Sequence, residues 1–259
     1  MPHVRSQQTV DTALLLSDLG ILDRQTAAIC GVAVKTVRRW RRLDQRRGLP
    51  RGQAHTTAPC PRCDGAPLDE VAYSLLLGWY LGDGHIVAYQ RGVYLLALFN
   101  DNRYVNLNAQ ILQTLATVKP GGRPFTRRQP GLIATGCYWK HWPCLFPQHG
   151  PGMKHTRRIA LEPWQIAIVE RHPGQFLRGL FHSDGCRVEN WTVKVVAGEP
   201  KRYTYPRYFF KQTSTDIMGL CQWALGLLGI GYTMPTPDNL SVARKADVAA
   251  LDAHVGPKS

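Results

Sequence analysis

The sequence repeats one pattern at two places, Leu76-Leu-Gly-Trp-Tyr-Leu-Gly-Asp83-Gly84 and Leu177-Arg-Gly-Leu-Phe-His-Ser-Asp184-Gly185. Both stretches read Leu-x-Gly-x-aromatic-x-small-Asp-Gly, and their aspartates lie 184 − 83 = 101 residues apart. A sequence that recurs at a long, fixed separation indicates a duplicated structural unit. The repeat therefore predicts a duplicated fold with one matched aspartate in each half.

Each copy has the features of a helix that ends at its aspartate. Apolar residues precede the motif, and a glycine, which is expected just beyond a helix C-terminus, follows the aspartate. Residues four apart share a helix face, and small side chains on that face let two backbones approach closely. We therefore expect the two helices to pack together through small residues of both copies, namely Gly78, Gly82, Gly179 and Ser183.

If the two helices pack in parallel, Asp83 and Asp184 lie side by side at their C-terminal ends. Neighbouring carboxylates repel each other, and a helix C-terminus also repels an anion. A divalent cation relieves both repulsions, and magnesium prefers oxygen ligands while keeping room for water and phosphate oxygens. The pair therefore predicts a Mg²⁺ (or Mn²⁺) site, and phosphodiester hydrolysis is chemistry that such a metal supports.

The two motifs resemble the paired motifs of single-chain LAGLIDADG homing endonucleases, and the resemblance spans about residues 70–255. It implies an α+β fold in which two pseudo-symmetric αββαββα halves form a saddle on double-stranded DNA. It also implies that the last acidic residue of each motif, Asp83 or Asp184, binds the catalytic metal. A basic or amide side chain near the scissile phosphate is implied at Asn100 in the first half and at Lys211 or Gln212 in the second. We favour Lys211 as a catalytic residue, because a cation can stabilise developing phosphate charge.

The sequence around the motifs repeats the order strand pair, then helix. In the first half we expect strands at 85–89 and 93–99 and a helix at 104–118. In the second half we expect strands at 187–196 and 203–210, a helix at 216–228, strands at 231–234 and 240–243, and a helix at 245–255. Successive strand side chains point to opposite faces, so about half of the basic ones can face DNA. The candidates are Arg187, Lys194, Arg202 and Arg207.

Residues 1–47 predict a small all-α domain in front of this scaffold. Apolar spacing indicates helices over 12–19, 23–29 and 34–42, with Asp23 as a cap and Gly31 in a turn. Residues 20–42 resemble the helix-turn-helix of bacterial DNA-binding proteins. The outer face of the last helix would then contact DNA through Lys35, Thr36, Arg38, Arg39 and Arg42. The alternative is an amphipathic helical hairpin with a charged outer face.

Residues 48–69 predict a linker, rich in Pro, Gly, Thr and Arg, before a domain over 70–259 whose halves are about 70–160 and 161–259. The linker carries Cys60-Pro-Arg-Cys63, which is half of a zinc site. The other cysteines and histidines that cluster, over residues 137–149, are distant in sequence, and we expect them in a different half. Zinc at Cys60 and Cys63 therefore lacks a full ligand set, and two ordinary thiols are the alternative.

The segment 138–155 is rich in aromatic and histidine residues and does not follow from the scaffold. It is open to three interpretations: an aromatic wedge that caps a helix, a second metal site, or a loop that contacts DNA. In the last case the contacts would come from Lys154, Arg157 and Arg158.

The charge of the chain favours a polyanionic partner, since 32 Lys and Arg against 18 Asp and Glu give a net charge of +14. No stretch is apolar enough for a membrane span, and the first residues lack a secretory leader, so we expect a cytoplasmic protein of bacterial or phage type. We expect a monomer with internal pseudo-symmetry. Two functions follow: a metal-dependent, site-specific double-strand DNA endonuclease, or a non-cleaving DNA-binding transcriptional regulator on the same scaffold.

Overall fold

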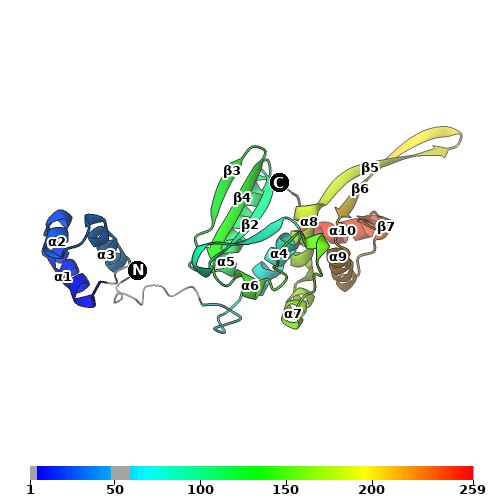
Figure 1. The fold of residues 1–259 in the computed structure, drawn as a ribbon. Helices are drawn as coiled ribbons and strands as arrows, with labels where there is room; N and C mark the ends of the chain where they lie inside the picture. The colour runs from blue at the N-terminus through cyan, green and yellow to red at the C-terminus, as the bar shows by residue number, and fades with distance from the viewer. Residues whose placement is uncertain (1–4, 48–58, 259) are drawn as a thin grey trace. The chain divides into compact units, whose positions relative to one another are not determined.

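The computed structural model describes residues 5–47 and 59–258, and the chain divides into two compact units between residues 57 and 58 (Figure 1). Each unit is described by itself. Among the described residues, no helix combines the length and the apolar character that a membrane crossing requires.

The first unit consists of three helices, α1 (Gln7–Asp18), α2 (Asp23–Ile29) and α3 (Val34–Arg47). Its core is formed by buried side chains of all three, including Val10, Ala27 and Trp40. Gly31 has a φ of +59°, so the turn between α2 and α3 uses a backbone conformation that glycine adopts without strain. The helices therefore follow the order that the sequence predicted.

The expected helix cap at Asp23 is wrong. Leu22 stands at the cap position of α2 without a side-chain hydrogen bond, and Asp23 is the first helical residue. Its carboxylate instead accepts hydrogen bonds from Arg38, at 3.1 Å, and from Arg41, at 2.6 Å. Asp23 therefore joins α2 to α3.

The second unit has two antiparallel four-stranded sheets, with strand orders β1-β2-β4-β3 and β5-β6-β8-β7. The first half contains α4 (Glu70–Leu81), β1 (Gly84–Ala88), β2 (Tyr94–Asp101), α5 (Val105–Val118), β3 (Phe125–Gln129), β4 (Leu132–Trp139) and α6 (Trp142–Leu145). The second contains α7 (Pro163–Arg171), α8 (Pro173–Asp184), β5 (Gly185–Val196), β6 (Glu199–Lys211), α9 (Thr215–Leu227), β7 (Thr233–Thr236), β8 (Asn239–Val242) and α10 (Lys245–Val255). Short 3₁₀ turns lie at Gln90–Gly92 and Lys154–Thr156. The predicted α+β fold, with a duplicated αββαββα order, is confirmed.

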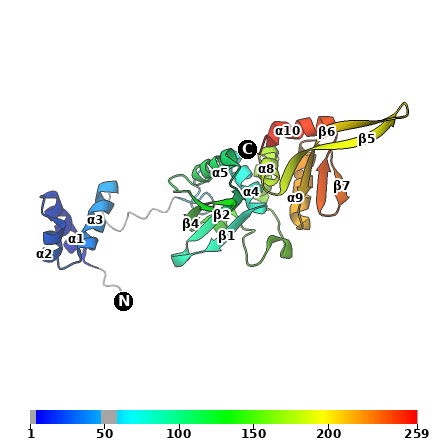
Figure 2. The ribbon, with the colours of Figure 1, turned by 90° about the horizontal axis from the view of Figure 1, so that it is seen from above.

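Helices α4 and α8, which carry the repeated motifs, pack against each other at the middle of the unit (Figure 2). A Cβ atom on Gly179 would lie 2.8 Å from the Cα of Gly78, and a Cβ on Gly78 would meet α8 just as closely. Gly82 faces Ser183 in the same way. The small residues therefore let the two backbones touch, which holds the ends of both helices together.

The glycines after the two aspartates are required by close packing against the preceding helix turn. Neither Gly84 nor Gly185 has a positive φ. A Cβ on Gly185 would lie 2.7 Å from the Cα of Phe181, and a Cβ on Gly84 would collide with Tyr80. Glycine is needed because each first strand starts directly against the preceding helix turn.

The two halves differ most in their first hairpins. Strands β5 and β6 pair from Gly185↔Phe210 to Val196↔Glu199 and extend beyond the helices as a two-stranded ribbon (Figures 1 and 2). The corresponding strand β1 has 5 residues, whereas β5 has 12. Strands β3 and β4 were not identified from the sequence. β3 is almost entirely exposed and has no alternating apolar residues, whereas β4 is mostly buried and shows no apolar–polar alternation.

Candidate active site at the ends of the motif helices

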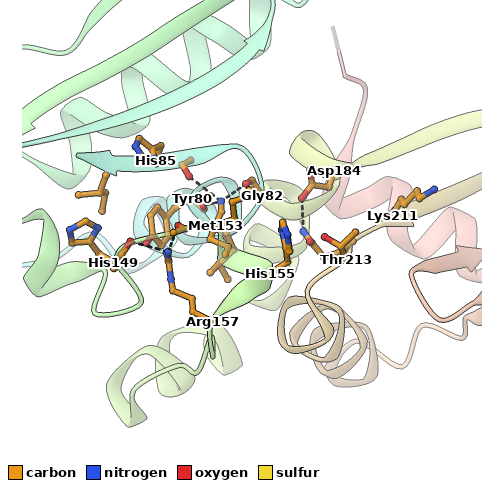
Figure 3. A pocket seen from close by; sticks show the side chains of 17 residues that line it. Tyr80, Gly82, His85, His149, Met153, His155, Arg157, Asp184, Lys211 and Thr213 are labelled. Atoms are coloured by element: carbon orange, nitrogen blue, oxygen red, sulfur yellow. Dashed lines mark hydrogen bonds between the residues drawn. The ribbon is translucent and has the colours of Figure 1, made fainter. Parts of the chain in front are cut away.

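A cavity of about 650 Å³ opens where the first motif helix ends. The end of α4, the loop over residues 149–157 and the end of β6 line it, and Figure 3 shows Asp184 and Lys211 on one side and His149 and Arg157 on the other. Arg157 donates hydrogen bonds to the carbonyls of Gly150, at 2.9 Å, and Gly152, at 2.7 Å, which orders the loop. Side chains from both halves therefore meet at this cavity.

The two motif aspartates are brought together at the helix ends. A Cβ on Gly82, the residue before Asp83, would lie 3.1 Å from Oδ2 of Asp184. Burial and the charge of Asp83 raise the pKa of Asp184 to about 6. Burial likewise raises the pKa of Asp83, while Lys258 and Lys154 lower it. The site thus holds two partly desolvated carboxylates that disfavour each other's charge.

Two lysines that the sequence analysis did not assign to the site bind next to these aspartates. Lys154 donates hydrogen bonds to the carbonyls of Tyr80, at 2.6 Å, Gly84, at 3.0 Å, and Gly82. Lys258 donates to the carbonyl of Ser183 at 3.2 Å. Gly82 and Ser183 are the residues directly before the two aspartates, so each motif presents an equivalent carbonyl to a lysine.

The lysines are themselves shifted by burial. Burial lowers the pKa of Lys154 to about 8, although Asp184 and Asp83 act in the opposite direction. Burial also lowers the pKa of Lys258, again opposed by both aspartates. Lys154 therefore remains mainly a cation at pH 7.

A second, smaller cavity of about 300 Å³ repeats the arrangement on the other side of the motif helices. Asp83, Asn100 and Lys258 line it, whereas Asp184, Gln212 and Lys154 line the larger cavity. Each cavity thus joins the aspartate of one motif to the lysine that follows the last strand of the opposite half. Two cavities with corresponding residues therefore lie at the ends of the motif helices.

Strand pairing identifies the counterpart of Asn100. Gly84 pairs with Leu98 and Gly185 pairs with Phe210, so two residues further on Asn100 corresponds to Gln212. Gln212 donates a 2.8 Å hydrogen bond to Oδ2 of Asp184. Gln212, one of the alternatives left open by the sequence, is therefore the residue that contacts a motif aspartate.

Lys211 lies beside the larger cavity but points toward a different partner. Its side chain is 72% exposed, and Nζ lies 3.8 Å from Asp238. By the same pairing its counterpart in the first half is Phe99, which is apolar. The catalytic role predicted for Lys211 stays a prediction, and Lys154 is held closer to the motif carbonyls.

The ribbon of β5 and β6 divides the four predicted DNA-binding residues between its two faces. Arg187 pairs with Asp252 of α10 at 2.8 Å, and the guanidinium of Arg202 lies 4.8 Å from the ring centre of Trp191. Strand alternation places both on the face that carries α10. Lys194 and Arg207 lie on the opposite, open face, where Arg207 contacts Ser241. The four candidates therefore divide evenly between the two faces, with Lys194 and Arg207 on the open one, and their contact with DNA stays a prediction.

Helix α3 presents most of its predicted DNA contacts to solvent. Lys35, Arg39 and Arg42 are exposed and Thr36 is half-buried. Arg38 is exposed as well, but it is paired with Asp23. Lys35 and Arg39 are therefore the clearest candidates on this helix.

Two histidines, His85 and His182, lie next to the motif aspartates in the sequence. His182 is 1% exposed, and burial lowers its pKa to about 4, so it is neutral and packed inside the unit. His85 is exposed and lines the larger cavity.

The expectation that Cys60 and Cys63 lack further ligands is wrong. His141 and Cys144 lie beside them, and the four ligand atoms are all within 4.8 Å of one another. Cys137 and His149, which the sequence placed in the same group, are not part of this cluster. The two pairs lie far apart in the sequence, so their spacing along the chain could not predict that they meet in the fold.

Among solved structures, the chain is similar to LAGLIDADG homing endonucleases. I-WcaI, solved bound to its DNA recognition sequence, has 14% identity and a TM-score of 0.45, covering 83% of this chain and 93% of that one. Mesophilic variants of I-DmoI have 12% identity and a TM-score of 0.46, covering 72% of this chain and 89% of theirs. No protein-family model and no curated protein matches the sequence.

Proposed function

We propose that this protein is a divalent-metal-dependent, site-specific endonuclease that cuts both strands of DNA. The observation that carries the proposal is the matched pair of cavities, each with a motif aspartate and a half-buried lysine, at the ends of two touching helices. Two related sites in one chain suit a substrate with two related strands. The net charge of +14 suits a polyanion.

The residues of the site fit a hard divalent cation. Asp83 and Asp184 offer carboxylate oxygens, and water and phosphate oxygens can complete the coordination of such an ion. A cation would relieve the repulsion that raises the pKa of Asp184. When bound, magnesium or manganese would activate water and polarise the phosphate for hydrolysis.

The side chains around the aspartates would orient and neutralise the reacting phosphate. Lys154 and Lys258 each supply a cation at the edge of one cavity, where the charge developing on a phosphate oxygen is stabilised. Gln212 holds Asp184 through its amide and so fixes the direction of that carboxylate. Each lysine would then act in the cleavage of one DNA strand. The two aspartates lie close enough to affect each other's pKa, so both would act in the cleavage of each strand.

The remaining basic residues would hold the DNA. Lys194 and Arg207 on the open face of the ribbon reach phosphates or base edges, and the first unit adds contacts from α3 through Lys35 and Arg39. A single chain carries both halves, so a monomer is sufficient to bind double-stranded DNA.

Cleavage of a randomised plasmid library in magnesium buffer, followed by sequencing of the new ends, tests the proposal. We expect double-strand cuts at one preferred sequence, which EDTA abolishes. Asp83→Asn and Asp184→Asn are each expected to remove cleavage of both strands while sequence-specific binding persists. The proposal would be contradicted if the wild-type chain selected one DNA sequence but made no cut in magnesium or manganese. That result would favour a non-cleaving DNA-binding regulator.

A further inference from the structure

A second metal-binding arrangement lies outside the cavities, in the cluster of Cys60, Cys63, His141 and Cys144. Three thiols and one imidazole are the ligands that zinc uses in closed, structural sites. None of the four residues lines either of the cavities that hold the aspartates. We propose that these residues bind one structural zinc ion, which is independent of the magnesium or manganese of the endonuclease sites.

The distances agree with tetrahedral zinc. With zinc–sulfur bonds of about 2.3 Å and zinc–nitrogen bonds of about 2.0 Å, tetrahedral ligands lie about 3.8 Å apart for two sulfurs and about 3.5 Å apart for sulfur and nitrogen. The Sγ atoms of Cys63 and Cys144 are 3.5 Å apart. Sγ of Cys144 and Nδ1 of His141 are 3.7 Å apart. These two distances are within about 0.3 Å of the tetrahedral values, and all four ligand atoms lie within 4.8 Å of one another.

The backbone around each pair is shaped to present its ligands. Cys60 and Cys63 belong to a tight turn in which the N–H of Cys60 donates to Asp64 Oδ2 at 2.7 Å and the N–H of Asp64 donates back to the Cys60 carbonyl at 2.8 Å. Gly65 follows with a φ of +65°. Both pairs have the spacing ligand-x-x-ligand, and His141 and Cys144 are joined by a 3.0 Å backbone hydrogen bond at the start of α6. Two preformed turns thus face each other.

The position of the cluster indicates what the zinc would stabilise. The first pair comes just before motif helix α4, and the second lies at the start of α6, after β4. Arg62, between the two cysteines, stacks over Trp164 of α7 at 4.6 Å. Next to Cys144, the Leu145 carbonyl accepts hydrogen bonds from Tyr73 of α4 and Gln165 of α7. The zinc would therefore hold the N-terminal end of α4 in place against both halves of the unit.

Zinc analysis of the full-length chain tests the proposal. The chain is purified without added zinc, dialysed against a weak chelator and measured by inductively coupled plasma mass spectrometry, with thiol accessibility followed in parallel. We expect one zinc per chain, reduced to background in Cys63→Ser and Cys144→Ser. Cys186→Ser, which removes an exposed cysteine outside the cluster, is the matched control and should keep the full amount. Asp83→Asn should also keep it, which separates this site from the proposed endonuclease sites.

Two further measurements have their main readout in the wild-type chain. Replacement of the metal by cobalt should give the visible absorption of a tetrahedral, thiolate-rich site in the wild type. A strong chelator such as 1,10-phenanthroline should lower the melting temperature of the wild type and leave that of Cys63→Ser unchanged. The proposal is overturned if the wild type holds no stoichiometric zinc, if Cys63→Ser retains it, or if mass spectrometry shows Cys63 joined to Cys144 as a disulfide.

Discussion

Replacement of Asp184 by asparagine should stabilise the protein at neutral pH while it abolishes cleavage. Asp184 lies beside Asp83 at the end of two helices, and burial together with that neighbouring charge raises its pKa from 3.8 to about 6. Asparagine has nearly the same shape and no charge, and its side-chain oxygen can still accept the hydrogen bond from Gln212. The substitution therefore removes a charge that the folded state disfavours.

The sign and size of the effect follow from proton linkage. The folded state binds the Asp184 proton more tightly than the unfolded state, so its contribution to stability is fully present below pH 3.8 and is lost as the pH rises through about 6. A shift of about two pKa units corresponds to about 3 kcal/mol at most, at about 1.4 kcal/mol per unit. Because Asp184 is partly solvent-accessible, we expect a gain of about 1–2 kcal/mol at pH 8 after screening. Near pH 4 the gain should vanish.

Urea denaturation of the full chain at pH 4.5 and pH 8, in EDTA and followed by tryptophan fluorescence, measures this difference. Six of the seven tryptophans belong to the second unit, so the signal reports mainly on the unit that contains Asp184. Asp252→Asn is the control of opposite sign, because Arg187 holds the pKa of Asp252 below its usual value. That variant should lose stability at pH 8. An Asp184→Asn protein that is no more stable than wild type at pH 8, or that keeps its gain at pH 4.5, would refute the reasoning.

Three other predictions concern the helix interface, the pH dependence and the first unit. Gly179→Ala, whose new Cβ would lie 2.8 Å from the Gly78 Cα, should cost about 2–3 kcal/mol in urea unfolding. Gly226→Ala, in α9 with no atom within 4 Å of its Cβ position, should gain about 0.5–1 kcal/mol, and equal stabilities would contradict the packing argument. The magnesium concentration that half-saturates single-turnover cleavage should fall between pH 5 and pH 7, because Asp184, whose pKa without metal is about 6, must lose its proton before it can bind the ion; a concentration that does not change over this range would oppose this assignment. The double variant Lys35→Ala, Arg39→Ala should weaken binding to all DNA sequences and reduce the slope of log affinity against log salt by about 2, whereas an unchanged slope would remove α3 from the interface.

The repeated motif predicted the centre of the fold, because its small residues and its aspartates carry local information. Gly78 and Gly179 are spaced for close helix packing, and that packing alone brings Asp83 next to Asp184. The order of strands and helices in the second half also followed from apolar spacing. Strand β3 did not, since its side chains face solvent and leave no pattern.

The rest of the site depends on contacts between residues that are distant in the sequence. Lys154 reaches the carbonyl of Gly82 from a loop more than seventy residues away, and Lys258 reaches Ser183 from beyond α10. A signal was present, because each lysine follows the last strand of its half, but only the duplicated fold makes the two positions equivalent. In the same way, Cys60 and Cys63 meet His141 and Cys144 only after the first half has folded.

Strand-resolved cleavage by Lys154→Met and Lys258→Met tests most directly whether one chain holds two matched sites. A duplex that contains the selected target is labelled on one strand at a time, and the products are separated on denaturing gels in magnesium buffer. Lys140→Met, which changes an exposed lysine away from both cavities, is the control and should cut both strands as the wild type does. The two matched cavities predict that Lys154→Met nicks one strand and Lys258→Met nicks the other. If both variants slow the two strands equally, or if neither alters cleavage, the assignment of one lysine to each strand is contradicted.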